Sequence, residues 1–388
     1  MLRIRTYNNI SIKGLDRFGR EQYEVASDIN RPDAILLRSY RLHDAPVPDS
    51  VQAIARAGAG VNNIPVDACT NKGVVVFNTP GANANAVKEL VLAGLLLSSR
   101  GILPGIAYAE SLAAADHTEL NKQLEAEKKR FAGREIAGQT LGVVGLGAIG
   151  SLVANMALGL GMNVIGYDPA LSVDAAWRLS SQVQKAENLQ SLLARSDFIS
   201  LHVPALPETQ HLIGTETLSC VREGAVILNF AREEIVDTDA ILTALQAGRI
   251  KTYVSDFPSA LLQGHPQVIA MPHLGASTAE SEENCAVMAA EQLKDFLENG
   301  NIRNAVNFPA TSMERISGNR LTLSNHNVPK VLGHVLSILA NRNINVIDMV
   351  NRSRNNVAYN ILDVDNEIDA SLLAEIAEVE HVIRVRAV

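Results

Sequence analysis

The segment at residues 145–150 constrains the fold of this 388-residue chain more than any other feature of its sequence. It reads Gly145-Leu146-Gly147-Ala148-Ile149-Gly150 and directly follows the apolar run Leu141–Val144. Apolar residues then recur at helical spacing, at Leu152, Val153, Met156, Ala157 and Leu160. Glycines at these three places permit a tight turn and close packing of a helix on a strand. The segment therefore predicts a strand–turn–helix unit of a parallel sheet.

Further apolar runs alternate with helical patterns from about residue 34 to residue 271, as a parallel α/β sheet covered on both faces requires. We expect strands at Ala34–Leu37, Val74–Phe77, Leu141–Val144, Val164–Tyr167, Phe198–Val203, Val226–Asn229, Tyr253–Ser255 and Val268–Met271. A chain of this length is too long for one compact core, so two or three domains are expected.

The tail has a different order of elements. Residues 307–312 have the composition of a connector. Beyond it we expect a strand at Leu321–Leu323, a helix at Val328–Leu339, strands at Asn345–Val350 and Val357–Val364, a helix at Leu372–Ile376 and a strand at Val382–Val388. The order βαββαβ is that of the ferredoxin-like unit.

The glycine segment and Asp168 together predict a dinucleotide site. Gly147 lets backbone N–H groups approach a pyrophosphate, and the following helix N-terminus favours the anion. Asp168 lies 18 positions after Gly150, at the end of the next expected strand, where a carboxylate accepts bonds from ribose hydroxyls. Its charge repels a 2′-phosphate, and Pro169 follows it rather than an arginine, so NAD is favoured over NADP. The alternative is a glycine-rich turn in a doubly wound fold that binds no nucleotide.

Composition excludes several classes of protein. The net charge of −8 argues against general binding to nucleic acid. The first 14 residues lack the apolar core of a signal peptide, and the richest apolar stretch, Ala86–Leu97, contains Lys88 and Glu89 and is too short to span a membrane. The three cysteines lie far apart, at Cys69, Cys220 and Cys285. They are expected to be small buried residues rather than a disulfide framework or a zinc site, and no metal and a cytoplasmic location are predicted.

Four motifs resemble those of D-2-hydroxyacid dehydrogenases. They are Phe131-Ala132-Gly133-Arg134-Glu135-Ile136-Ala137-Gly138 with the glycine segment, Leu201-His202-Val203-Pro204, Asn229-Phe230-Ala231-Arg232, and Met271-Pro272-His273-Leu274-Gly275-Ala276-Ser277-Thr278. The tail resembles an ACT domain, which narrows the resemblance to the short type of D-3-phosphoglycerate dehydrogenase. The resemblance covers essentially the whole chain. It implies a flavodoxin-like substrate-binding domain at residues 1–88 and 276–310, a Rossmann-type NAD-binding domain at 89–275 and an ACT regulatory domain at 316–388.

Arg232 and His273 are the candidate catalytic residues. Each follows an expected strand, and ligands of open α/β sheets bind outside the carboxyl ends of strands. Oxidation of an alcohol needs a base for the hydroxyl proton and a cation for the substrate carboxylate. The resemblance implies that His273 is the acid/base and that Arg232 anchors the carboxylate. Taken singly, each has an ordinary alternative as a loop histidine or a solvated surface charge.

The sequence departs from the family pattern in two places. Ala260 occupies the position where the family has a glutamate that pairs with the histidine. Asp256 matches the family aspartate that contacts the nicotinamide amide, and it is also a candidate to orient His273. Glu233 replaces the usual glycine after the arginine. These changes are expected to lower activity or to shift its pH profile without removing hydride transfer.

The resemblance also implies the remaining ligand contacts. The expected NAD contacts are Gly145, Gly147, Ala148, Ile149, Gly150, Asp168, His202, Val203, Pro204, Phe230, Ala231, Arg232, Asp256, His273 and Gly275. The expected substrate contacts are Arg38, Ser39, Gly58, Ala59, Gly60, Asn83, Arg232 and His273, with Asn78 to Pro80 and Lys88 nearby. A phosphate contact and a plain surface charge are equally good interpretations of Arg38.

Asn325, Asn327 and Asn345 are candidates to bind an amino acid such as L-serine at a subunit interface, because ACT domains that bind serine use polar side chains at these places. The alternative is that these asparagines only cap and turn the chain. A homodimer or homotetramer is expected.

The resemblance predicts NAD-dependent oxidation of D-3-phosphoglycerate to 3-phosphohydroxypyruvate, the first step of L-serine biosynthesis. One alternative is a reductase of glyoxylate, hydroxypyruvate or another D-2-hydroxyacid, which uses the same machinery without a phosphate site. An alternative of another class is an NAD-binding sensor or corepressor without catalysis, which Ala260 makes conceivable and the presence of both Arg232 and His273 disfavours.

Overall fold

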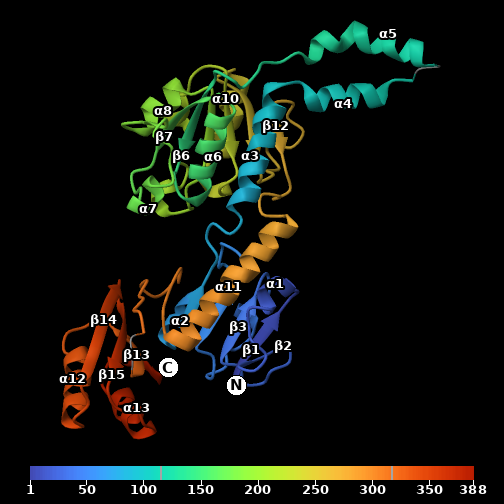
Figure 1. Cartoon of the computed structure of the whole chain (residues 1–388). Coiled ribbons are helices and arrows are strands. Elements are labelled where there is room, and N and C mark those ends of the chain that lie inside the picture. Colours follow the sequence, from blue (N-terminus) through green and yellow to red (C-terminus); the bar gives the residue numbers. More distant parts are fainter. Residues whose placement is uncertain (114–115, 316–317) are drawn as a thin grey trace. The chain divides into compact units, whose positions relative to one another are not determined.

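The structure is a computed structural model that describes residues 1–113, 116–315 and 318–388 (Figure 1). It divides into two compact units, the first formed by residues 1–83 and 279–388 and the second by residues 84–278. The chain thus passes between units within a few residues of the expected boundaries at 88 and 275. The expected start of the third domain, at residues 316 and 317, lies outside the described residues, and residues 318–388 are grouped with the first unit.

The second unit contains a seven-stranded sheet in the order β12-β11-β10-β9-β6-β7-β8. Its strands are β6 (Thr140–Val144), β7 (Asn163–Tyr167), β8 (Gln184–Lys185), β9 (Phe198–Leu201), β10 (Ala225–Asn229), β11 (Ile250–Ser255) and β12 (Val268–Ala270). All neighbouring strands run parallel. Because β6 pairs with both β7 and β9, the strand order reverses there, as in a Rossmann fold. The predicted nucleotide-binding fold is confirmed.

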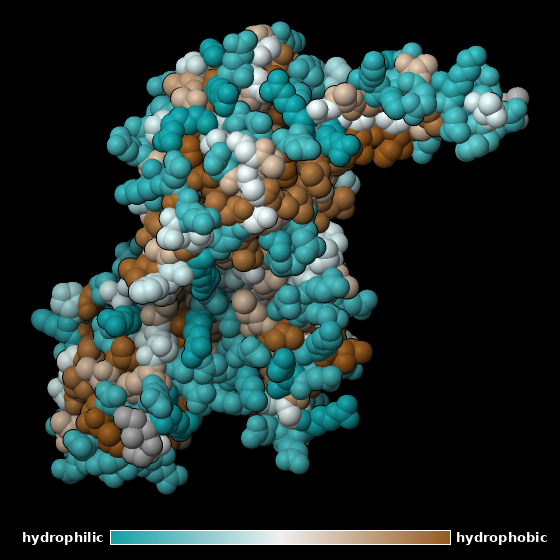
Figure 2. Space-filling view, turned by 45° about the horizontal axis from the view of Figure 1, so that its top comes forward, coloured by the Kyte–Doolittle hydropathy of each residue, from teal (hydrophilic) through white to brown (hydrophobic). Residues whose placement is uncertain are grey.

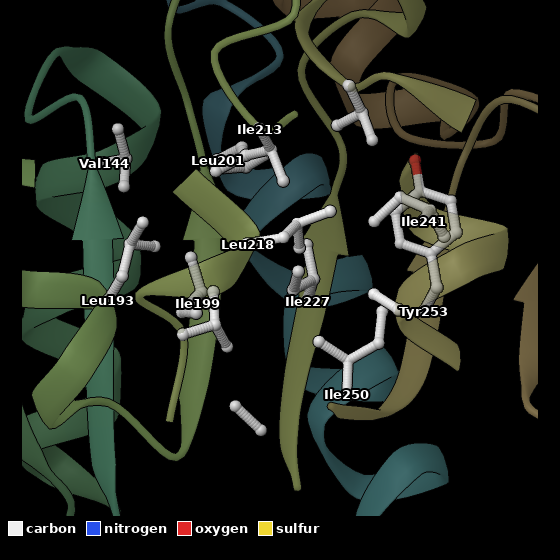
Figure 3. Packing of buried hydrophobic residues seen from close by; sticks show 14 of the residues in the cluster. Val144, Leu193, Ile199, Leu201, Ile213, Leu218, Ile227, Ile241, Ile250 and Tyr253 are labelled. Carbon is white, nitrogen blue, oxygen red and sulfur yellow. The ribbon is translucent and has the colours of Figure 1, made fainter. Parts of the chain in front are cut away.

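Helices cover both faces of this sheet. They are α3 (Ala84–Ser99), α6 (Ala148–Gly159), α8 (Leu189–Arg195), α9 (Thr215–Ser219) and α10 (Thr238–Gln246), and the short helix α7 (Val173–Ala176) follows β7. Strand β10 is buried at every position, and alternate residues enter different cores. Ile227 packs with Ile199 and Tyr253 in one core (Figure 3). Leu228 lies in the other core. Burial on both faces explains why these strands are continuous apolar runs in the sequence.

The first unit is built on a five-stranded parallel sheet in the order β2-β1-β3-β4-β5. Its elements are β1 (Leu2–Tyr7), α1 (Ile12–Leu15), β2 (Tyr23–Ala26), β3 (Ala34–Leu37), β4 (Ala53–Arg56), α2 (Val66–Asn71), β5 (Val75–Phe77) and the long helix α11 (Ala279–Asn299). The sequence predicted β3 and β5 but missed β1, β2 and β4. Strand β1 alternates apolar residues with Arg3 and Arg5, so it has no apolar run, and Arg3 instead pairs with Glu24 on β2.

Residues 319–387 form a four-stranded antiparallel sheet in the order β14-β15-β13-β16. The elements are β13 (Asn319–His326), α12 (Val331–Asn341), β14 (Val346–Arg354), β15 (Val357–Val364), α13 (Ala370–Ala377) and β16 (Val382–Ala387). The predicted βαββαβ order is confirmed. Helix α12 begins three residues later than predicted, because Lys330 before it has a left-handed backbone with φ of 79°. Strand β14 is an edge strand, and Ile347 and Met349 on it are exposed.

Helices α4 (Ile102–Ser111) and α5 (His117–Glu127) belong to the second unit. The hydroxyl of Tyr108 on α4 donates to the carbonyl of Gln123 on α5 at 3.2 Å. Helix α4 has no buried residue, and its Leu103 and Ile106 are exposed. Apolar surface, coloured brown, is visible on the projecting part formed by α4 and α5 in Figure 2. No single helix in the described part of the chain is long and apolar enough to cross a membrane, although α3 and α4 pass that test as a pair bent by 68°.

Candidate active site

The glycine loop between β6 and α6 has no room for other residues at two of its three glycines. Gly145 has a φ of +88°, and a Cβ there would lie 2.6 Å from the carbonyl oxygen of His202. A Cβ at Gly150 would lie 1.9 Å from the carbonyl oxygen of Gly145. At Gly147, by contrast, an added Cβ would meet no described heavy atom within 4 Å beyond its chain neighbours and the atoms of its own helix. The loop is therefore tight on the protein side and open where a pyrophosphate would approach, which fits a dinucleotide.

Asp168 follows β7 and is fixed beside this loop. One carboxylate oxygen accepts from the backbone N–H of Leu146 at 2.8 Å, and the other accepts from Ala170 at 2.9 Å. Each oxygen retains acceptor capacity for a ribose hydroxyl. The carboxylate borders a cavity of about 350 Å³, which Leu146, Tyr167, Pro169, Leu171, Val183 and Lys185 also line. The position and charge of Asp168 fit an adenosine ribose with a free 2′-hydroxyl.

His202 follows β9 at the point where the strand order reverses. Its Nε2 is hydrogen-bonded to the hydroxyl of Ser200 at 2.8 Å. Its Nδ1 is buried and has no hydrogen-bond partner among the described residues. Burial lowers the pKa of His202 from its ordinary value of 6.5 to about 3, so the ring is neutral at physiological pH. An unpaired hydrogen-bonding atom beside the glycine loop is a further feature that fits a bound dinucleotide.

The other predicted cofactor contacts next to these strands differ in how far they are exposed. A side-chain methyl of Val203 lies 2.9 Å from where a Cβ on Gly145 would stand, so Val203 lies against the glycine loop. Pro204 is exposed. Phe230 and Ala231, which follow β10, are buried in the core. Sequence reasoning did not select Ser200, whose signal was a polar residue inside a fully buried strand.

Arg232 follows β10 and is exposed. The buried side chain of Asn229 holds the turn before it, since its Nδ2 donates to the carbonyl of Arg232 at 2.9 Å and its Oδ1 accepts from Ala231 N–H at 3.2 Å. The guanidinium Nη1 donates to the carbonyl of Ala231 at 2.7 Å. Asn229 was not among the predicted site residues. It is fully buried at the end of the otherwise apolar strand β10, and it begins the motif that also contains Arg232.

His273 follows β12 and is also exposed. Its backbone has a φ of 56°, and its N–H donates to the carbonyl of Asp256 at 3.0 Å. The carboxylate of Asp256 accepts from the N–H groups of Leu274 at 2.7 Å and Gly275 at 2.8 Å. The ring of Phe257 meets the His273 imidazole edge-on, with centroids 5.0 Å apart. Asp256 and His273 are thus brought together. The carboxylate, however, is bound to the backbone of residues 273–275, the histidine loop, and not to the imidazole ring.

Ala260 lies in the segment between β11 and β12. It lines a cavity of about 650 Å³ together with Phe257 and Pro272, which are sequence neighbours of Asp256 and His273. Ala260, which stands in place of the family's glutamate, is therefore a small side chain at a cavity close to the loop of His273.

Most of the predicted substrate residues lie in the first unit, whose first segment ends at Asn83, whereas Arg232 and His273 lie in the second unit. A guanidinium nitrogen of Arg38 is 2.7 Å from a carboxylate oxygen of Glu282. The backbone N–H of Ser39 donates to Asn8 at 3.1 Å. Arg38 is therefore already engaged in an ion pair that a phosphate would have to replace.

The loop containing Gly58, Ala59 and Gly60 is braced by two side chains. Arg56 donates to the carbonyl of Gly60, and Asn78 donates to the carbonyl of Ala59 at 2.6 Å. Arg56 was not selected from the sequence. It adds a cation beside a loop of predicted substrate contacts.

The three candidate effector asparagines are not equivalent. Asn325 is buried, and its Oδ1 accepts from Asn360 at 2.9 Å while its Nδ2 donates to His326 at 2.7 Å. Asn327 and Asn345 are exposed. The structure therefore leaves Asn327 and Asn345 accessible and uses Asn325 within the sheet.

The cysteines and the possible metal ligands were compared with the predictions for them. Cys69, Cys220 and Cys285 are free; Cys69 and Cys285 are buried, as predicted, whereas Cys220 is only partly buried. Within residues 1–113, 116–315 and 318–388, no group of three or more His, Cys, Asp or Glu side chains is placed to hold a metal ion.

Comparison with known proteins was consistent across three measures. Residues 106–275 match the family model of the D-isomer specific 2-hydroxyacid dehydrogenase, NAD binding domain. The chain is 33% identical to D-3-phosphoglycerate dehydrogenase of Methanocaldococcus jannaschii over 86% of its length, but spans only 62% of that relative. It is 30% identical to D-3-phosphoglycerate dehydrogenase of Haemophilus influenzae, with 98% of the chain and 92% of the relative covered.

A solved structure gives the same result. The NAD⁺-bound 3-phosphoglycerate dehydrogenase of Entamoeba histolytica matches with a TM-score of 0.59 and 26% identity, covering 79% of the chain and 98% of that protein. The glycine loop, Asp168 and the unpaired His202 nitrogen fit the same cofactor. The chain therefore belongs to the D-isomer-specific 2-hydroxyacid dehydrogenase family, and its cofactor is NAD.

Proposed function

We propose that this chain oxidises D-3-phosphoglycerate to 3-phosphohydroxypyruvate with NAD, the first step of L-serine biosynthesis. The observation that carries the proposal is the placement of Arg232 and His273. Both are exposed, and they follow β10 and β12, the two strands that flank β11 in the NAD-binding sheet. The names of the relatives from Methanocaldococcus and Haemophilus support the choice of substrate.

The residues divide the reaction between them. His273 accepts the proton of the C2 hydroxyl, and Arg232 binds the substrate carboxylate through charge-assisted hydrogen bonds. NAD held at the glycine loop and Asp168 would supply the acceptor for the hydride that leaves the same carbon. One proton and one hydride leave the alcohol, so the product is a ketone. In the reverse direction, protonated His273 returns the proton to the developing alkoxide.

Two further roles are proposed for the first unit. The loop of Gly58, Ala59 and Gly60 supplies backbone N–H groups for the substrate, as turns rich in glycine do for anions. Arg38 binds the phosphate in exchange for Glu282. An exposed ion pair of this kind contributes only about 0–1 kcal/mol, so a dianion can displace the carboxylate.

The Arg38–Glu282 ion pair also favours a second candidate function. A reductase of glyoxylate or hydroxypyruvate needs no phosphate ligand, and an arginine neutralised by a carboxylate suits an uncharged substrate end. The two functions differ in whether activity depends on the substrate phosphate.

A steady-state assay that follows the formation or the consumption of NADH separates the candidates. D-3-phosphoglycerate, D-glycerate and 2-hydroxyglutarate are compared as substrates with NAD, and glyoxylate with NADH. We expect the highest kcat/KM for D-3-phosphoglycerate. The variant His273→Ala should lose turnover by about 10²–10⁴-fold while still binding NADH. A preference for D-glycerate or glyoxylate would favour the second candidate, and a His273→Ala variant within twofold of wild type would exclude the assigned base.

We also propose that an amino acid, L-serine, binds between two copies of the chain. Strands β13 and β14 both pair antiparallel with β15, so they run in the same direction. Asn327 follows the end of β13, whereas Asn345 precedes the start of β14, so the two lie at opposite ends of one sheet. An antiparallel pairing of two β14 edges centred on Val350 sets Asn345 opposite Asn355 of the partner subunit. In one chain, Asn355 accepts a bond from Asn327, so the pairing brings the two asparagines to one place.

The same proposal includes a homodimer or homotetramer in the cytoplasm. Two surfaces support it: the exposed edge β14 with Ile347 and Met349, and helix α4 with exposed Leu103 and Ile106. Calorimetry with L-serine should show binding that Asn327→Ala and Asn345→Ala each abolish. Light scattering should show an oligomer whose mass falls in Leu103→Ser/Ile106→Ser. A monomeric wild type, or serine binding unaffected by both asparagine variants, would contradict this arrangement.

A further inference from the structure

Asp256, at the end of β11, makes hydrogen bonds to backbone groups through both its side chain and its main chain. It is only 1% exposed. Its carboxylate accepts from Leu274 and Gly275, and its carbonyl accepts from His273 N–H. Its own N–H donates to the carbonyl of Asn229 at 3.0 Å. Every polar group of Asp256 is thus bonded to backbone, and three consecutive N–H groups of the histidine loop, at residues 273–275, end on this one residue.

The loop needs such a restraint because of its backbone conformation. His273 is in the left-handed region with φ of 56°, which residues with a Cβ rarely adopt unless their surroundings impose it. The close approach of the loop is also sterically set, since a Cβ on Gly275 would lie 2.9 Å from Oδ2 of Asp256. Phe257, next to Asp256 in the chain, packs edge-on against the His273 ring.

We propose that Asp256 is a positioning residue that fixes His273 through the backbone of residues 273–275. The inference rests on the proposed role of His273 as acid/base. A carboxylate accepting two N–H groups makes charge-assisted hydrogen bonds, which are shorter and stronger than neutral ones. The restraint replaces the pairing of carboxylate and ring that Ala260 cannot provide. The histidine is held by its main chain and by Phe257 rather than by an acid at its imidazole.

Asp256→Asn tests the proposal with little change of shape. The amide retains one acceptor oxygen, but its NH₂ group then faces an N–H donor, so one bond to the loop is lost. Asp237→Asn is the matched control, because Asp237 also accepts from two backbone N–H groups, those of Asp239 and Ala240, both at 3.1 Å. Asp237 lies in the same unit, at the start of α10.

Three quantities are measured on wild type and on both variants. They are amide hydrogen exchange at residues 273–275, kcat and KM for the hydroxyacid, and the dissociation constant of NADH. In Asp256→Asn we expect faster exchange at Leu274 and Gly275 and a kcat lower by about 10–100-fold, since small misplacements of a reacting group have effects of this size. KM should stay within about twofold, and NADH binding should weaken by a smaller factor than kcat falls. The control should leave exchange and kcat within about twofold, because both N–H groups donate to one oxygen of Asp237, which asparagine retains.

Other results would overturn the proposal. Unchanged exchange, or faster exchange with unchanged kcat, would show that Asp256 does not position His273. Weaker NADH binding with unchanged kcat would make Asp256 a cofactor ligand. If Asp256→Asn does not fold, Gly275→Ala, whose Cβ presses on Asp256, is measured instead and should lower kcat in the same way. His273→Ala, measured in parallel, tests the acid/base role separately, because the exchange results do not depend on it.

Discussion

The backbone N–H of Asp256 donates to the carbonyl of Asn229, and this bond joins the ends of the neighbouring strands β10 and β11. From Asn229 the network continues to the carbonyl of Arg232, and from Asp256 it continues to the N–H of His273. The two catalytic candidates therefore sit on one chain of hydrogen bonds, in which Asn229 and Asp256 are buried and Arg232 and His273 are exposed.

Asn229→Ala should lower kcat/KM by raising KM for the hydroxyacid, because the turn that presents Arg232 loses both of its side-chain bonds. The loss of a buried hydrogen-bonding partner should also lower the free energy of unfolding by about 1–3 kcal/mol. Asn155→Ala is the control, since Asn155 makes the same two kinds of bond, to Arg178 and Ser180, elsewhere in this unit. If both variants lose stability but neither changes KM, the turn at Asn229 does not determine how Arg232 binds the substrate carboxylate.

Asp168→Ala should weaken NADH binding by about tenfold or more, because a charge-assisted bond to the ribose is lost. NADPH should be affected less, since the variant also loses the repulsion of the 2′-phosphate. Titration of intrinsic or NADH fluorescence measures both constants. Glu187→Ala, a carboxylate lining the same cavity, should leave the ratio of the two constants unchanged. Equal affinity of wild type for NADH and NADPH would refute the role of Asp168.

His202 predicts how stability depends on pH. Its pKa in the folded protein is about 3, below the ordinary 6.5, so between these values the unfolded chain binds a proton that the folded chain does not. Stability should therefore fall as the pH drops below about 6.5, by up to ~1.4 kcal/mol for each pH unit from this group. His202→Gln should flatten this part of the curve of Tm against pH.

The reference for His202→Gln is its Tm difference from wild type at pH 8, where His202 is neutral in both states. That difference reports packing alone and should shrink or reverse toward pH 5. Parallel curves for the two proteins down to pH 5 would mean that His202 is readily protonated in the folded state.

Sequence reasoning succeeded where structure is encoded locally. The glycine loop and Asp168 were predicted because strand, turn and helix are contiguous in sequence. Strand β1 was missed because its neighbours in the sheet, and not an apolar run, make it a strand. The partners of Asp256 were not predictable, because they depend on how residues 18 and 19 positions away in the chain fold back onto it.

The ion pair between Arg38 and Glu282 leads to the last prediction, which concerns the substrate phosphate. The two side chains are 40% and 46% exposed, so their attraction is screened and contributes at most about 1 kcal/mol. Glu282→Gln removes the competitor, and KM for D-3-phosphoglycerate should fall by up to about fivefold, the factor to which that energy corresponds. KM for glyoxylate should not change, because it has no phosphate to exchange for the carboxylate.

Two further variants complete this test. Arg38→Gln should raise KM for D-3-phosphoglycerate and cancel the effect of Glu282→Gln in the double variant, because both act through one guanidinium. Glu283→Gln removes the same charge from the adjacent position, where the carboxylate pairs with Lys13. It therefore controls for the loss of one negative charge from α11. If Glu283→Gln lowers KM as much as Glu282→Gln, the effect is one of net charge. If Arg38→Gln leaves KM unchanged, the phosphate is bound elsewhere, and Arg56, which donates to the carbonyl of Gly60, becomes the cation to test next.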